Sequence, residues 1–132
     1  MSVTGKGSYQ VTGWDEKPYD EQDGTAKLTR AQVTNTFSGD IEGQGSVEWL
    51  MCYSPDGAAR FVGLQRVEGS LGGRRGSFVI ESVGDHDGKR SKGDWTIVAG
   101  SGTGELYGIT GRGGFDAPGG PQVSYRLDYQ LP

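Results

Sequence analysis

Apolar and polar residues alternate along most of this chain, so that every second side chain falls on the same face of an extended strand. The alternation is clearest over Gly43–Gly84, which reads GQGSVEWLMCYSPDGAARFVGLQRVEGSLGGRRGSFVIESVG. This stretch predicts three consecutive β-strands joined by two tight turns. No segment shows the period of an amphipathic helix, so we expect an all-β protein.

Two turn sequences predict how these strands pair. The segment SPDGA at 54–58 predicts a three-residue hairpin loop, because Pro55 suits the first corner of a type I turn and Gly57 suits the left-handed position that closes it. The dipeptide Gly72-Gly73 predicts a two-residue hairpin loop. The resulting register pairs Met51 with Phe61, Trp49 with Gly63, Val47 with Gln65, Val67 with Phe78, Gln65 with Ile80 and Gly63 with Ser82.

This register divides the side chains between two faces of the sheet. One, which we call the aromatic face, holds Val47, Trp49, Met51, Tyr53, Phe61, Gly63, Gln65, Val67, Phe78, Ile80 and Ser82. The other, the mixed face, holds Ser46, Glu48, Leu50, Cys52, Val62, Leu64, Arg66, Val79, Glu81 and Val83. We expect the aromatic face to line the interior. The mixed face is too apolar for an ordinary wetted surface, so either it meets another subunit or the two faces are reversed.

Further strands are predicted on both sides of this stretch, at 2–14, 26–39, 91–100 and 123–131, with a strand-like, glycine-rich segment at 100–115. The segment Asp15–Gly24 carries five carboxylates and is expected to be a solvated acidic loop, or else a lid that uses Trp14, Pro18 and Tyr19. About eight antiparallel strands in a single domain, residues 1–132, predict a closed β-barrel with room for one small ligand. A two-sheet sandwich is the alternative.

Composition and charge exclude several classes of partner. The net charge is −4 and no basic cluster is present beyond short turns, so we expect no binding to nucleic acid. No apolar run is long enough to cross a bilayer, and we expect no membrane partner. The first residues, MSVTGKGSYQ, lack the apolar core of a signal peptide, which predicts a cytoplasmic protein. The single cysteine allows no disulfide within the chain.

Conventional catalytic motifs are absent from the sequence. His86 is the only histidine, and we expect it to be exposed in a turn that contains Asp87-Gly88. The acidic loop lacks the ligand spacing of a calcium site, and one histidine with one cysteine cannot form a closed zinc site. The glycine-rich segment has neither a dinucleotide-binding nor a P-loop spacing. We therefore expect neither a metal nor a cofactor.

Five motifs point to a known family. They are SGDIEGQG at 38–45, VEWLMCYSPDG at 47–57, FVGL at 61–64, LGGRRGSF at 71–78 and GTGELYGITGRGGF at 102–115. With them, nearly the whole chain resembles a bacterial family of unknown function that is assigned to the allene-oxide-cyclase-like barrels. The G-T-G-x-x-x-G-x-x-G pattern is also similar to plant allene oxide cyclases and dirigent proteins, and spirotetronate cyclases have barrels of similar shape.

The resemblance implies a closed barrel with a ligand-binding lumen, commonly in a dimer or trimer, without implying one activity. It also places Cys52 where the plant cyclases have a cysteine in the lumen, which would put the mixed face inside. The carboxylate and asparagine near the first strand of those enzymes have no clear counterpart here. A buried or interface cysteine without a catalytic role is the alternative.

Three functions agree with these features. The first is a cofactor-independent cyclase or isomerase of a hydrophobic metabolite, with Gln65 as the polar anchor and catalysis by positioning. Its lumen walls would be Trp49, Met51, Tyr53, Phe61, Phe78, Trp95 and Tyr125. The second is a non-catalytic carrier that uses the same cavity. The third is a filled barrel whose mixed face forms an oligomer interface.

A different site follows if the faces are reversed. The lumen would then hold Glu48, Cys52, Arg66 and Glu81, and two carboxylates near one arginine could form an acid–base pair. On an outer face the same charged residues are a surface ion-pair ladder. The sequence leaves both arrangements open.

Overall fold

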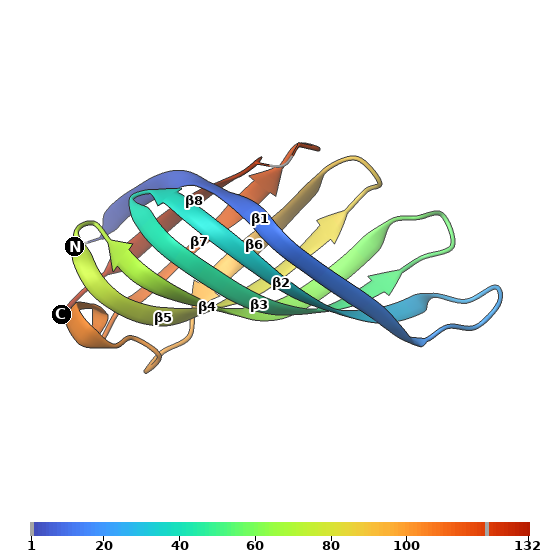
Figure 1. The fold of residues 1–132 in the computed structure, drawn as a ribbon, viewed down its shortest axis with the longest axis horizontal. Coiled ribbons are helices and arrows are strands. Elements are labelled where there is room, and N and C mark those ends of the chain that lie inside the picture. The colour runs from blue at the N-terminus through green and yellow to red at the C-terminus, as the bar shows by residue number, and fades with distance from the viewer. Residues whose placement is uncertain (1, 121) are drawn as a thin grey trace.

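The computed structural model describes residues 2–120 and 122–132, and it shows a closed barrel of antiparallel strands (Figure 1). The strands are β1 (Val3–Asp20), β2 (Lys27–Gly39), β3 (Ile41–Tyr53), β4 (Ala59–Leu71), β5 (Arg74–His86), β6 (Ser91–Ile97), β7 (Thr110–Ala117) and β8 (Gln122–Gln130). Each strand pairs with the next in the chain, and β8 pairs with β1. The predicted all-β barrel is confirmed, and closure removes the unpaired edges that an open sheet would expose.

The register of β3, β4 and β5 follows the two predicted turns. The Ser54 amide donates to the Ala58 carbonyl over 2.8 Å, and Gly57 has a φ of +94° as the turn requires. Gly72 and Gly73 both have positive φ angles. All six predicted residue pairs are present in the two ladders. Local turn chemistry therefore sets the pairing of this part of the sheet.

The predicted acidic loop is wrong for its first half, because β1 continues to Asp20. A register shift after Val11 removes one residue from the pairing, and the following side chains change faces. Trp14 and Glu16 then pair with Val33 and Ala31, which are buried on the inner side of β2. The long-range ladder with β2 overrides the charged composition of this segment, and the connection is limited to residues 21–26.

The glycine-rich segment is not a continuous strand, and β6 ends at Ile97 rather than at Gly100. Residues 98–109 form a connection with one short 3₁₀ helix, η1 (Gly104–Leu106). This connection runs beside β5, where the Thr103 amide donates to the Ser77 carbonyl and the Val79 amide donates to the Ser101 hydroxyl. The connection thus supplies hydrogen-bond partners to the part of β5 that β6 does not reach.

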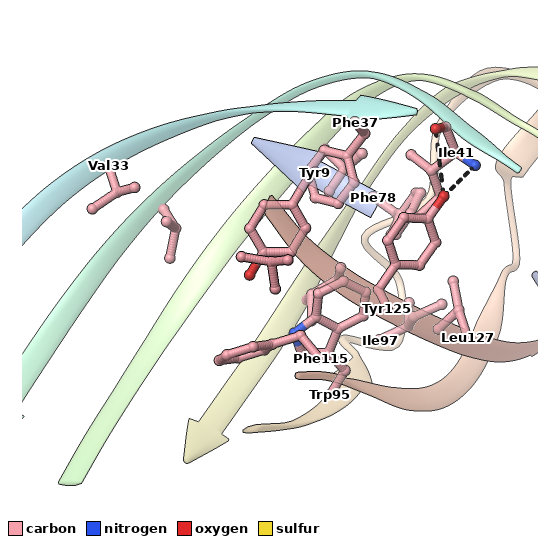
Figure 2. Packing of buried hydrophobic residues seen from close by; sticks show 14 of the residues in the cluster. Tyr9, Val33, Phe37, Ile41, Phe78, Trp95, Ile97, Phe115, Tyr125 and Leu127 are labelled. Carbon is pink, nitrogen blue, oxygen red and sulfur yellow. Dashed lines mark hydrogen bonds between the residues drawn. The ribbon is translucent and has the colours of Figure 1, made fainter. Parts of the chain in front are cut away.

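The two ends of the barrel differ. The closed end carries η1, the β2–β3 and β4–β5 turns and both chain termini, whereas the other four connections lie at the opposite, open end (Figure 1). Leu106, the last residue of η1, and Ile109, which follows it, are buried. The Ile41 amide donates to the Tyr125 hydroxyl over 2.8 Å (Figure 2). The same hydroxyl donates to the Ser38 carbonyl. Side chains therefore fill the closed half and tie β8 to the β2–β3 turn.

The aromatic face points into the barrel and the mixed face points outward. Trp49, Gln65 and Phe78 are buried, whereas Leu50 and Leu64 are about half exposed. The described residues include no helix of the length and hydrophobicity that a membrane crossing requires.

Candidate functional site

A cavity of about 430 Å³ occupies the open end of the barrel. Aromatic rings form most of its wall, and they come from Tyr9, Trp14, Trp49, Phe61 and Phe115. Val33, Met51 and Val123 add aliphatic surface. Polar groups come from Asn35 and Ser91, and from the Tyr9 hydroxyl and the Trp14 indole N–H. Among the residues that the structure describes, no lysine or arginine belongs to this lining. An apolar hollow with a few polar groups is the usual composition of a small-molecule site.

Two hollows of about 560 Å³ lie on the outer surface, one over β5–β8 and one over β3–β5. The first is lined by charged side chains and by glycine backbone, and Arg60–Asp85 and Arg90–Asp116 ion pairs cross it. Both hollows face solvent along the outside of the wall. The smaller cavity inside the open end is therefore the better candidate for a site that encloses a ligand.

Glycines on neighbouring strands make room for the rings that line the cavity. The Cε3 atom of Trp49 lies 2.6 Å from the place where a Cβ of Gly63 would be, and the Cε1 atom of Phe115 lies 2.5 Å from that of Gly93. The rings therefore lie against bare backbone on the wall instead of crossing the lumen. Trp49 also packs edge-to-face on Phe61, with ring centroids 4.9 Å apart.

Asn35 carries an unsatisfied polar atom on the cavity wall. Its Nδ2 atom donates to Gln65 Oε1 over 2.9 Å, whereas its Oδ1 atom is buried and has no hydrogen-bond partner among the described residues. Only 2% of Asn35 is exposed. A buried acceptor without a partner is costly, and Asn35 belongs to the cavity lining.

Tyr9 places a phenol on the same wall. Its ring contacts Phe37 and Trp95, and in Figure 2 its hydroxyl points away from Ile41. Burial raises the pKa of Tyr9 well above its ordinary value. The phenol therefore stays protonated, and it can donate a hydrogen bond to a ligand at any physiological pH.

Glu16 stands at the rim of the cavity as the acceptor of three hydrogen bonds. Thr29 Oγ1 and Tyr53 Oη each donate to Glu16 Oε2 over 2.6 Å, and Trp14 Nε1 donates to Oε1 over 3.1 Å. Trp14 belongs to the cavity lining, and Tyr53 Oη lies 3.6 Å from the sulfur of Met51, which also belongs to it. The carboxylate is thus fixed between groups that reach the cavity.

These contacts determine whether Glu16 and Tyr53 are ionised at neutral pH. Partial burial alone would raise the pKa of Glu16, but the hydrogen bonds from Thr29, Tyr53 and Trp14 and the charge of Lys27 outweigh it and lower this pKa. Burial, followed by the neighbouring Glu16 carboxylate, raises the pKa of Tyr53. At neutral pH the rim therefore presents an ionised carboxylate and a neutral phenol.

The other side of the rim carries His86 and Ser91, which face each other across the β5–β6 ladder. His86 Nδ1 lies 2.6 Å from Ser91 Oγ. The prediction of an exposed turn histidine is wrong, because His86 ends β5 and is partly buried. No carboxylate hydrogen-bonds to His86 among the described residues, so the pair lacks the third group of a catalytic triad.

The structure divides the eight predicted lumen residues by depth. Trp49, Met51 and Phe61 line the cavity, and Tyr53 lies at its rim. The remaining four are buried but do not belong to the cavity lining; they are Gln65, Phe78, Trp95 and Tyr125. A role in ligand binding stays a prediction for every member of the set.

Sequence reasoning missed several residues that line or flank the cavity. Alternation assigns Tyr9 to one face of its strand and Asn35 to one face of the next strand. No feature of these segments predicts that the two faces line the same cavity as Trp49. Phe115 ends the glycine-rich segment 100–115, where the sequence pattern does not assign it to a face of the sheet. Glu16 gave no signal at all, because the register shift that turns it inward depends on the pairing with β2.

The alternative polar site is not in the interior. Glu48 is exposed, and it accepts hydrogen bonds from Arg30 Nη2 over 2.6 Å and Gln32 Nε2 over 2.9 Å rather than from Arg66. Arg66 and Glu81 are exposed on the same outer face, and Cys52 lies there with partial exposure. The lumen position that the resemblance implies for Cys52 is therefore wrong, because the aromatic face occupies the interior.

Together, the fold and the site define a class of protein: a closed eight-stranded antiparallel β-barrel with an aromatic-walled cavity at one end. The chain belongs to the DUF3224 family, described as proteins of unknown function, which it matches over residues 5–129. The resemblance to a family of unknown function is confirmed, whereas a relationship to allene oxide cyclases stays a prediction.

A solved structure supports the same assignment. The crystal structure of a protein of unknown function from the DUF3224 family of Shewanella oneidensis MR-1 is similar to this chain, with a TM-score of 0.81 and 26% sequence identity. The similarity covers 100% of this chain and 99% of that chain. No curated protein matches the chain.

Proposed function

We propose that this protein binds a small, largely apolar molecule in the cavity at the open end of the barrel. The observation that carries the proposal is the combination of aromatic walls with one buried, unpaired acceptor, Asn35 Oδ1. The volume of about 430 Å³ lies within the range of small-molecule sites. Apolar walls supply affinity, and the single amide oxygen orients the ligand.

A second proposal concerns chemistry on the bound molecule. The walls would hold a flexible substrate in one reactive conformation, and the protonated Tyr9 phenol could donate a hydrogen bond to a substrate oxygen as charge develops there. This would make the protein a cofactor-independent cyclase or isomerase. A carrier without activity uses the same cavity, and turnover distinguishes the two.

Filling the mouth of the cavity tests both proposals. Ala117 ends β7, is partly buried and lies on the cavity lining, so an indole in its place would occupy the ligand volume. We expect Ala117→Trp to weaken binding of the neutral apolar dye Nile red about tenfold or more, because the buried apolar contact area is lost. Dye fluorescence titrations measure the effect, and thermal melts check that the variant is folded.

Ala99→Trp is the matched control, since Ala99 is exposed on the β6–η1 connection. It should bind the dye as the unmodified protein does. Equal binding by both variants would contradict the cavity as the site. If a polyene or epoxide substrate is converted by the unmodified protein and not by Ala117→Trp, the barrel is catalytic; binding without conversion favours the carrier.

We also propose that the outer face of β3–β5 meets a second copy of the chain. Leu50, Val62 and Leu64 are each about half exposed there, and they form one apolar patch. Arg30 and Glu48 border the patch, and further charges of both signs, Arg66 and Glu81, lie on the same face. A border of mixed charge can complement itself across a twofold axis, which is what a symmetric dimer requires.

Leu64→Glu should separate such a dimer, because it places a charge at the most exposed of the three apolar positions, which is 56% exposed. We expect analytical ultracentrifugation to show dimers of the unmodified protein and monomers of the variant. Val98→Glu, outside the patch, should stay dimeric. A monomeric unmodified protein would contradict the proposal. The cytoplasmic location stays a prediction.

A further inference from the structure

The polar and charged groups on the cavity lining limit the class of ligand that the cavity can bind. Its aromatic rings present electron-rich faces, and Asn35 adds an amide oxygen that has no donor. The described part of the chain places no lysine or arginine on the lining, so a carboxylate or phosphate would find no counter-charge there. Burying an anion without a counter-charge is strongly unfavourable. The interior is therefore suited to neutral molecules and to cations.

The rim adds a negative charge to this arrangement. Glu16 forms no ion pair within the described part of the chain, although three side chains donate hydrogen bonds to it. Those bonds hold the carboxylate still, and Lys27, whose charge lowers the pKa of Glu16, forms no ion pair with it, so the carboxylate can pair with an incoming cation. Trp14, which donates a hydrogen bond to Glu16, belongs to the cavity lining. Met51 belongs to it too, and its sulfur lies 3.6 Å from the hydroxyl of Tyr53.

The ammonium group of Lys27 lies over the aromatic ring of Tyr53 at this rim. Lys27 Nζ lies 5.1 Å from the centroid of the Tyr53 ring, within the range of a cation–π contact. The same Tyr53 donates its hydroxyl proton to Glu16. A carboxylate beside aromatic rings is a recurring arrangement for binding organic ammonium groups.

We infer that the ligand is a small organic amine, with its ammonium group beside Glu16 at the rim and its apolar body between the aromatic walls. The inference rests on the proposed function, since it names the class of molecule that the cavity binds. Asn35 lies four residues beyond Ala31, the ladder partner of Glu16, which is roughly 13 Å along β2 by strand geometry. A hydroxyl or N–H group at the inner end of the ligand would satisfy Asn35 Oδ1.

Three probes of nearly equal size test this inference, because they differ in one group. Tyramine ends in a CH₂–NH₃⁺ group, tyrosol in a CH₂–OH group and 4-hydroxyphenylacetate in a carboxylate; all three keep the phenol. In competition with Nile red on the full chain, we expect tyramine to bind about tenfold or more tightly than tyrosol. Hydroxyphenylacetate should be the weakest of the three.

Glu16→Gln separates the rim charge from the shape of the cavity. The variant should bind tyramine and tyrosol about equally, because the rim charge that favours the ammonium group is gone. Glu48→Gln is the matched control, because it removes a carboxylate from the outer surface, and it should keep the preference for tyramine. Thermal melts of both variants exclude unfolding as the cause.

The outcomes distinguish this inference from the function on which it rests. Equal binding of tyramine and tyrosol, a preference for hydroxyphenylacetate, or an unchanged preference in Glu16→Gln would overturn the amine assignment. Failure of all three probes to displace the dye would overturn it too, while the proposed cavity would stand as long as Nile red binds the unmodified protein. If the unmodified protein does not bind Nile red, both the proposed function and the amine assignment are overturned.

Discussion

Replacing Gly69 by alanine is expected to destabilise the barrel severely. Gly69 has a φ of +149°, and a Cβ there would lie 2.1 Å from the Glu42 carbonyl oxygen and 2.8 Å from the Gly43 Cα. These atoms belong to the neighbouring strand of the ladder, so they cannot move away without breaking the pairing of β3 with β4. The conformational strain and the clash together should cost about 4 kcal/mol or more, a large part of the stability of a domain.

Two other glycines provide graded controls for this prediction. Gly73 also has a positive φ, +83°, but a Cβ there meets no atom within 4 Å, so Gly73→Ala should cost about 1 kcal/mol. Gly120 has neither constraint, and Gly120→Ala should be neutral. Urea unfolding followed by circular dichroism measures all three. A Gly69→Ala protein as stable as Gly120→Ala would show that the strands do not approach so closely.

Trp49→Ala is expected to have the second largest effect, on both stability and binding. The indole is 8% exposed, packs on Phe61 and lies against the backbone of Gly63. Its removal leaves a large void in the wall of the barrel, which should lower the free energy of unfolding by about 3–5 kcal/mol. For a chain of this size, the melting temperature should fall by roughly 10 °C or more.

Glu48→Ala is the neighbouring control, because Glu48 lies one residue away and faces the opposite side. Its carboxylate is exposed and pairs with Arg30 on the surface, where ion pairs contribute little. Thermal melts and Nile red titrations should therefore show a large loss for Trp49→Ala and little change for Glu48→Ala. The opposite ranking would mean that the aromatic face is not the inner one.

The pairing of β3, β4 and β5 could be predicted because its determinants are local. The SPDGA and Gly72-Gly73 turns each set the register of the hairpin that they close, and the period of two then assigns every side chain to a face. The division into an aromatic and a mixed face follows from two short motifs. Which face lies inside was predicted from residue types, since the closed barrel buries the more apolar side.

The extent of β1 and the course of residues 98–109 could not be predicted in this way. Carboxylates dominate the end of β1, and only the ladder with β2 makes that segment a strand. The connection around η1 is held by Ser101 and Thr103, whose hydrogen bonds go to β5, far away in sequence. Such contacts depend on the closure of the barrel and leave no local signal.

The sequence by itself determined the strand class, the hairpin register and the apolar wall that Trp49, Met51 and Phe61 provide, because turn residues and side-chain alternation act within a few residues. Only the tertiary structure decided that Tyr9, Asn35 and Phe115 join this wall and that the closed half is filled. A barrel brings together residues from strands far apart in the chain, and the shift after Val11 alone turns Glu16 toward the rim. The place of the cavity is therefore a property of the closed sheet, which no single segment contains.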